Sequence, residues 1–416
     1  MSEPLNMHKV REPQYFDRFR CIGAECEDTC CAGWGVLVDE ETYERYQNPL
    51  LRVADKPLSS LIEINPARSG AGDYAKIRMD EQATCPALHQ GLCSIQQTFT
   101  ELYIPDLCST YPRVLTMTGG ALEKSLHLSC PEAARLVLND PDAMIFHERM
   151  EEAPPRRPRS VAVIAGEPDD SLYAVRTLFA EVIRERSIPL WQRIVSIGFV
   201  MDKLAGVGTA RAVPVLEDHL RNLRQGLFRE LFASQRSDPA FQLETVLDLV
   251  VARIGSDYIG PRFLQCYSDF MRGLAWTADS SMEELAARCT LACRSYLQPF
   301  VRAHQHMLEN YLVSYIFRTV FPYRRKLPDQ KFAMDSGEES LRNAFFLLAV
   351  HYSIVRTLLT GMAALHQGLN AKQVVQLVQS YSKAFLHSTA FETAAVEYLG
   401  NNLKEPASGI AALVMD

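Results

Sequence analysis

The chain has 416 residues and a formal net charge of −7, and hydrophobic and charged residues make up 47% and 22% of it. These proportions exclude a disordered chain and permit a large buried core, and at about 150 residues per domain the length predicts roughly two or three domains. The balance of 50 Asp and Glu against 43 Lys and Arg argues against a nucleic-acid partner, because general nucleic-acid binding leaves a basic footprint.

The N-terminal segment predicts no targeting signal. It reads MSEPLNMHKVREPQYFDRFR and lacks the apolar core of a signal peptide. The most apolar run, residues 344–355, contains His351 and Tyr352 and is shorter than the roughly 18 residues that a membrane helix needs, so it is typical of a buried helix. We therefore expect a cytoplasmic protein with no membrane partner, in a compartment where thiols stay reduced.

The first 150 residues predict an irregular α+β region. Short β-type runs, GVLVD (35–39) and YAKIRM (74–79), alternate with turn-rich segments that contain cysteine. The segment RVLTMTGGALEKSLHL (113–128) predicts a hairpin, because its two extended runs flank Gly119-Gly120, a pair that accepts the positive φ of a tight turn.

A proline-rich segment, EEAPPRRPRS (151–160), predicts a linker over 151–170. Beyond it, apolar residues recur at i, i+3 and i+4, the spacing of a helix. Helices are predicted over 171–187, 189–205, 210–233, 240–254, 260–276, 281–297, 299–320, 338–366 and 371–388. The fold class is therefore mainly α, with an irregular α+β, cysteine-rich domain over 1–150 followed by an all-α domain over 171–416.

Eight of the eleven cysteines lie in the first 130 residues. They form the groups Cys21-x4-Cys26-x3-Cys30-Cys31 and Cys85-x7-Cys93, followed by Cys108 and Cys130. Because several of them fall within a short polar segment of a chain expected to stay reduced, a metal site is favoured over a disulfide framework. Eight buried reduced thiols remain an alternative, since free cysteine is among the most buried residue types.

The spacing favours iron over zinc. Four-thiolate zinc sites usually pair short CxxC segments, and the chain has no CxxC, whereas iron–sulfur clusters accept wider spacings. Eight thiols could hold one four-iron cluster with four to spare, two clusters, or one cluster beside structural cysteines. The radical-type motif CxxxCxxC is not present, because after Cys26 and Cys30 its third position is Gly33.

Two aromatic residues lie next to these cysteines. Trp34 follows the double cysteine and could line a pocket, and Tyr111 and Arg113 lie just after Cys108. A nucleotide-binding glycine loop is not indicated, because GVGTA (206–210) follows a helical pattern rather than a strand.

The cysteine segments and their flanks resemble the flagellin lysine-N-methylase (FliB) family in order and spacing. The matching segments are FRCIGAECEDTCCAGWGV, CPALHQGLCSIQQTFTE, CSTYPR, LSCPEAARL and, in the helical region, LENYLVSYIFRTVFPY (308–323). The part from Cys26 through TYPR also resembles a broader family of small proteins that bind zinc or an iron cluster.

The resemblance implies methyl transfer from S-adenosylmethionine to lysine ε-amines of flagellin, associated with an iron–sulfur cluster of the 4Fe-4S type, with zinc as the second choice. It carries over as candidate metal ligands Cys21, Cys26, Cys30, Cys31, Cys85, Cys93, Cys108 and Cys130, and it assigns no catalytic residue. The helical domain would then recognise flagellin. Two alternatives stay open: a cluster-binding redox or interaction module without methyltransferase activity, and a structural zinc protein.

Overall fold

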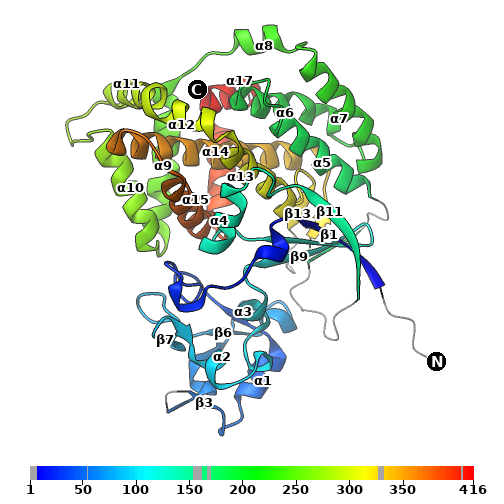
Figure 1. Ribbon diagram of the computed structural model, residues 1–416, viewed down its shortest axis with the longest axis vertical. Coiled ribbons are helices and arrows are strands. Elements are labelled where there is room, and N and C mark those ends of the chain that lie inside the picture. The colour runs from blue at the N-terminus through cyan, green and yellow to red at the C-terminus, as the bar shows by residue number, and fades with distance from the viewer. Residues whose placement is uncertain (1–6, 54, 153–161, 166–169, 327–331, 404–405) are drawn as a thin grey trace.

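The computed structural model describes residues 7–53, 55–152, 162–165, 170–326, 332–403 and 406–416. Over these residues the protein is mainly helical, as the sequence predicts. A large helical body carries a sheet along one side, and a smaller body that contains α1, α2 and α3 lies below it (Figure 1).

The helical body begins at α5 and continues to the C-terminal end. Its elements are α5 (Ser171–Ile183), α6 (Leu190–Leu204), α7 (Thr209–Arg224), α8 (Arg229–Ser234), α9 (Pro239–Ser256), α10 (Pro261–Gly273), α11 (Met282–Ala292), a π-helical turn (Cys293–Leu297), α12 (Gln298–Ala303), α13 (Gln305–Arg318), α14 (Glu338–His366), α15 (Ala371–Phe385), α16 (Thr389–Asn402) and α17 (Pro406–Val414). The helical periodicity is thus confirmed, and α16 and α17 extend the helices beyond the last predicted one.

Helix α14 is the central element of this body. In the part of the chain that the structure describes, it is the one helix long and apolar enough to cross a membrane, and 94% of its most apolar stretch is buried inside the protein. It crosses α10 with backbone against backbone, because a Cβ placed on Gly273 would lie 1.8 Å from the carbonyl oxygen of Gly361. The burial of residues 344–355 in a helix is as the sequence predicts.

A seven-stranded sheet of order β11-β1-β10-β9-β12-β14-β13 lies beside the helices. Its strands are β1 (Met7–Pro13), β9 (Arg113–Thr118), β10 (Ala121–Leu126), β11 (Phe146–Glu152), β12 (Ala162–Ala165), β13 (Arg324–Lys326) and β14 (Phe332–Met334). The β9–β10 hairpin is confirmed, with Gly119 and Gly120 at φ values of 51° and 74°.

This sheet takes strands from both sides of the expected linker. Strand β12 lies within 151–170 and pairs in parallel with β9 and with β14. The prolines at 154, 155 and 158 lie outside the described residues. The prediction of an all-α domain over 171–416 is therefore wrong in one respect: its described residues also contain the short strands β13 and β14, which apolar periodicity did not indicate.

The N-terminal α+β region divides between two hydrophobic cores. Val36, Tyr46, Leu58 and Ile104 belong to a small separate core, whereas residues 126–144 pack into the core of the helical body. The small body contains β2 (Leu37–Val38), α1 (Glu40–Tyr46), β3 (Arg52–Val53), β4 (Lys56–Pro57), β5 (Ile62–Ile64), β6 (Ala75–Ile77), β7 (Leu88–His89), β8 (Leu92–Cys93), α2 (Ser94–Thr98) and α3 (Asp106–Thr110). Helix α4 (Pro131–Asn139) packs instead against α13 and α15.

A buried ion pair attaches the hairpin to the helical body. The two Nη atoms of Arg176 in α5 donate to the two carboxylate oxygens of Glu123 in β10 at 2.7 and 2.5 Å, and Thr118 Oγ1 donates to the same carboxylate at 2.6 Å. Arg176 is fully buried. The sheet and the helices are therefore held together by charge as well as by apolar packing.

Candidate active site between the cysteine segments and the helices

Five of the eight candidate cysteines face one cavity of about 520 Å³ between the small body and the helical body. They are Cys30, Cys31, Cys85, Cys93 and Cys108. The helical body contributes Arg253, Asp257, Lys383 and His387 to the same cavity. The site therefore lies where the two bodies meet.

Local structure brings these cysteine segments together. The backbone N–H of Cys85 donates to the carbonyl oxygen of Cys31 at 2.8 Å, next to an isolated β-bridge between Ala32 and Thr84. Cys93 is the N-cap of α2, and Cys108 lies in α3. Three short elements therefore present their thiols to one space, although up to 78 residues separate them along the chain.

Burial in the protein raises the pKa of most of these thiols and so disfavours their ionised form. Burial raises the pKa of Cys85 to about 11 and also raises the pKa of Cys93. Cys108 is accessible to solvent on the side of the cavity that it lines, but the surrounding protein raises its pKa well above the usual value. The pKa of Cys31 shifts the other way, because it is hydrogen-bonded to the Cys30 thiol and lies near the charge of Lys383. A bound metal would supply the positive charge that keeps buried thiols deprotonated.

The other three candidate cysteines form a separate group. Burial raises the pKa of Cys26 and, to about 11, that of Cys130. The charge of Cys21 adds to the rise at both, and that of Cys26 adds to the rise at Cys130. Cys130 is the buried N-cap of α4, and the Cys26 thiol donates to the carbonyl oxygen of Asp28 at 3.4 Å. None of the three lines the 520 Å³ cavity.

The cysteine spacing suits a group larger than a single ion. A tetrahedral zinc with Zn–S bonds of about 2.3 Å holds its sulfurs about 3.8 Å apart. Among the described residues, no three cysteine sulfurs lie within 4.8 Å of one another. The thiols instead surround a cavity, which fits the wider thiolate separation around an iron–sulfur cluster.

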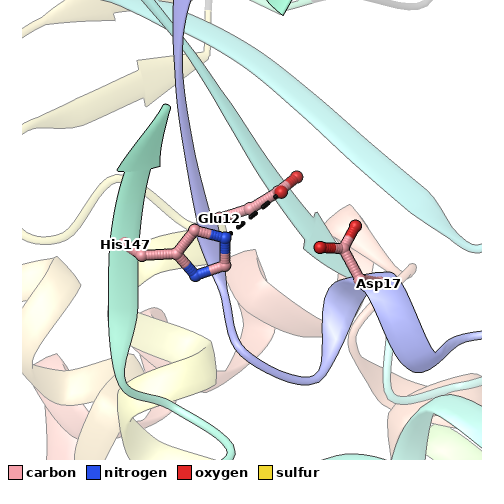
Figure 2. Close-up of side chains that lie close together, drawn as sticks. All are labelled: Glu12, Asp17 and His147. Carbon is pink, nitrogen blue, oxygen red and sulfur yellow. Dashed lines mark ion pairs between the residues drawn. The ribbon is translucent and has the colours of Figure 1, made fainter. Parts of the chain in front are cut away.

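A second group of potential ligands consists of Glu12 and His147 on strands β1 and β11 and Asp17 on the short helical turn after β1 (Figure 2), with ligand atoms within 4.8 Å of one another. Glu12 is fully buried, and its Oε1 lies 3.4 Å from His147 Nε2. However, Arg149 Nε lies 2.7 Å from the same oxygen and Lys124 Nζ lies 3.5 Å from the other one. Because two cationic side chains already compensate Glu12, this group is a charge network of the sheet and does not make a metal site.

Aromatic side chains form one wall of the cysteine cavity. The Trp34 ring lies 5.1 Å from that of Tyr111 and 5.0 Å from that of His387, between ring centres. Ser129 Oγ lies 3.0 Å from Tyr111 OH and 2.9 Å from His387 Nε2. Trp34 lines this cavity, as its position after the double cysteine suggested, and Tyr111 lines it too, whereas Arg113 does not.

Helix α15 holds the first cysteine segment in place. Lys383 Nζ donates to Asp28 Oδ1 at 2.5 Å and to the carbonyl oxygen of Thr29 at 3.0 Å, and it lies 5.3 Å from the Trp34 ring centre. Gln379 Nε2 donates to the second Asp28 oxygen at 2.7 Å. Sequence reasoning missed Lys383 and His387. Lys383 lies in the last turn of α15, and His387 follows the end of that helix, four residues later. This spacing was the available signal.

A larger cavity of about 880 Å³ adjoins the first and shares His387 and Thr389 with it. Its charged lining consists of Arg318 and four acidic residues, Asp335, Glu338, Glu339 and Glu392, an excess of three negative charges.

His387 lies where the two cavities meet. Its ring centre is 4.6 Å from that of His127, which lines the larger cavity. Burial, together with the charges of Arg318 and Lys383, lowers the pKa of His387 to about 4. The imidazole is therefore uncharged near neutral pH.

Comparison with known proteins gives one family and several relatives. The model of the FliB lysine N-methylase C-terminal domain matches residues 176–410. The chain is 32% identical over 144 residues to a protein named Lysine-N-methylase from Salmonella typhimurium, an alignment that covers 34% of this chain and 35% of that protein. It is 31% identical over 144 residues to "Flagellar biosynthetic protein FliU" from Salmonella muenchen, covering 34% of this chain and 83% of that protein. The alignment with the Lysine-N-methylase thus spans about a third of its length, and no solved structure matches the chain.

Proposed function

The chain belongs to the FliB lysine N-methylase family, and from that premise we propose that it transfers the methyl group of S-adenosylmethionine to lysine ε-amines of flagellin. The family match covers more than half of the chain. The name of the FliU relative, a flagellar biosynthetic protein, supports a flagellar substrate. The cytoplasm remains the proposed compartment, because thiol ligands need a reducing environment.

The reaction needs a neutral amine aligned with the methyl donor. A free lysine has a pKa of about 10.4, so the ammonium must lose a proton before its lone pair can attack. The new N–C bond then forms as the C–S⁺ bond breaks, the donor leaves as a neutral thioether, and the methylated ammonium releases a proton to solvent or to a carboxylate. Alignment in a closed site supplies much of the rate.

The observation that carries the proposal is that an acidic cavity and the cysteine cavity meet at His387. The carboxylates of Glu338, Glu339 and Glu392 would attract a lysine ammonium, and one of them could accept its proton. Glu392 belongs to α16, the helix that begins at Thr389, two residues after His387. A lysine side chain drawn in by these carboxylates would therefore approach the cysteine cavity.

The residues between the cavities suit a positively charged methyl donor. His387 is neutral at the pH of the reaction, so it does not repel a sulfonium. The charge of Lys383 is compensated by Asp28. Trp34 and Tyr111 line this cavity, and Lys383 Nζ already lies 5.3 Å from the Trp34 ring centre. An aromatic wall of this kind suits a cation, because an aromatic ring carries negative charge on its face.

We further propose that the cysteines hold an iron–sulfur cluster, a four-iron one, with zinc as the alternative. Cys30, Cys31, Cys85, Cys93 and Cys108 are the first candidates, because they line one cavity. When bound, such a cluster would supply an iron position able to coordinate the amino and carboxylate groups of the donor.

The test begins with purification without air and measurement of iron and zinc. The protein is then incubated with flagellin and methyl-labelled S-adenosylmethionine, and mass spectrometry locates the label. We expect iron in the protein and label on flagellin lysines. Zinc with no label would refute the proposal, and iron without affinity for S-adenosylmethionine would favour the cluster-binding redox or interaction module.

A pair of variants separates the role of the cluster from general damage. Cys108→Ser should lose iron and methyl transfer together. Cys289→Ser, at a cysteine of α11 that lines neither cavity, should keep both. A Cys108→Ser protein without iron that still transfers methyl at the full rate would contradict a catalytic role for the cluster.

A further inference from the structure

A third cavity, of about 370 Å³, shares no lining residue with the other two. It lies between the start of α6, the π-helical turn and α14, and four arginines line it: Arg186, Arg193, Arg302 and Arg356. Asp416 is the one acidic residue in that lining. This concentration of positive charge has no role in the methyl transfer proposed above.

Two of the arginines share a single carboxylate. Glu309 Oε2 accepts from Arg186 Nε and Nη2 at 2.9 and 2.7 Å, and Glu309 Oε1 accepts from Arg193 Nη1 at 2.8 Å. Arg193 is 2% exposed, and its Nε has no hydrogen-bond partner. Arg193 therefore brings a buried guanidinium, held by Glu309, to the lining of this cavity.

Of the other two arginines, Arg356 has an ion pair and Arg302 has none among the described residues. Arg356 Nε donates to Asp416 Oδ1 at 3.1 Å, and its Nη2 lies 3.2 Å from Cys293 Sγ. Arg302 is exposed and forms no ion pair with any of the described residues. Counting the Glu309 and Asp416 side chains against the four guanidinium groups leaves two positive charges uncompensated.

The start of α6 adds a further feature suited to an anion. This helix has 15 residues, with Pro189 as its N-cap, and residues 187–190 line the cavity. The first amide groups of a helix have no partner within the helix and carry a partial positive charge. The start of this helix and the four arginines line the same cavity, a combination that favours an oxyanion.

We propose that this cavity binds the phosphate or carboxylate group of a small molecule. Guanidinium groups recognise both oxyanions through paired N–H donors. The cavity volume of about 370 Å³ lies in the lower part of the range for small-molecule sites. The bound oxyanion neutralises the excess positive charge of the lining, so it also stabilises the fold.

The test uses the full chain and calorimetric titration at constant ionic strength, with inorganic phosphate in one arm and succinate in the other. We expect at least one of the two to bind with a Kd below about 1 mM, and to raise the thermal midpoint by mass action. The arm that binds more tightly identifies the oxyanion. Absence of binding in both arms would overturn the proposal.

Matched variants locate the site. Arg302→Gln removes one exposed guanidinium from the lining and should weaken binding about fivefold or more. Arg294→Gln makes the same charge change at an exposed residue of the π-helical turn that does not line the cavity, and should leave the Kd unchanged. Equal weakening by both variants would show that binding depends only on the overall charge of the protein surface, and would refute a site at this cavity.

Discussion

Replacing Glu123 by alanine should destabilise the protein strongly. In the folded state Glu123 pairs through both carboxylate oxygens with Arg176, a fully buried side chain. After the substitution, Arg176 keeps only the carbonyl oxygens of Leu172 and Phe317, each at 3.3 Å. Breaking a buried ion pair by removing one partner costs about 3–5 kcal/mol, and we expect the free energy of unfolding to fall by that amount.

The assay is urea unfolding followed by circular dichroism. Combining Glu123→Leu with Arg176→Met removes both charges and should recover most of the loss, because no uncompensated charge then remains in the core. Glu397→Ala, at an exposed position of α16, should change stability by less than about 0.5 kcal/mol. A loss below about 1 kcal/mol for Glu123→Ala, or a double variant no more stable than Glu123→Ala, would refute the reasoning.

Three further predictions concern packing, pH and the docking of the cysteine segment. Gly273→Ala should lower stability by about 1–3 kcal/mol, measured by urea unfolding, because its Cβ meets the carbonyl oxygen of Gly361. Burial lowers the pKa of His351 to about 3, below its unfolded value of about 6.5, so protonation favours unfolding. Stability should fall as the pH drops below 6.5, by about 1.4 kcal/mol per unit for this residue; His351→Gln should lessen that slope, and an unchanged slope would contradict the assignment. Asp28→Asn leaves Lys383 without its ion pair and should lower methyl transfer more than stability, as compared by labelling and by urea unfolding; a loss of stability alone would count against its place at the site.

The local features of the fold were predictable from the sequence. Helical periodicity depends on residues three or four apart, and it located the helices from α5 to α15. The β9–β10 turn followed from Gly119 and Gly120, the two residues that adopt positive φ there. The clustering of cysteines before residue 131 and the neighbouring Trp34 and Tyr111 also indicated where a site would lie.

The tertiary structure decided which of the cysteines line the same cavity. Spacing gave eight equivalent candidates, but folding places five of them around one cavity and leaves Cys21, Cys26 and Cys130 apart. Lys383 and His387 join that cavity from about 350 residues farther along the chain than Cys30 and Cys31. Burial and charge at these positions come from long-range packing, which no local spacing encodes.

The division of the chain shows the same limit. Composition indicated a cysteine-rich first part and a helical second part, because both properties depend only on the residues within each segment. It could not indicate that β12 pairs with β9 and β14, or that Glu123 and Arg176 form a buried ion pair. Such contacts become favourable only when distant segments are already close, because the entropy of closing long loops must be offset by the packing of the whole molecule. The sequence by itself thus determined the helices, the hairpin and the clustering of the cysteines along the chain, and the tertiary structure alone decided which of these residues line one cavity.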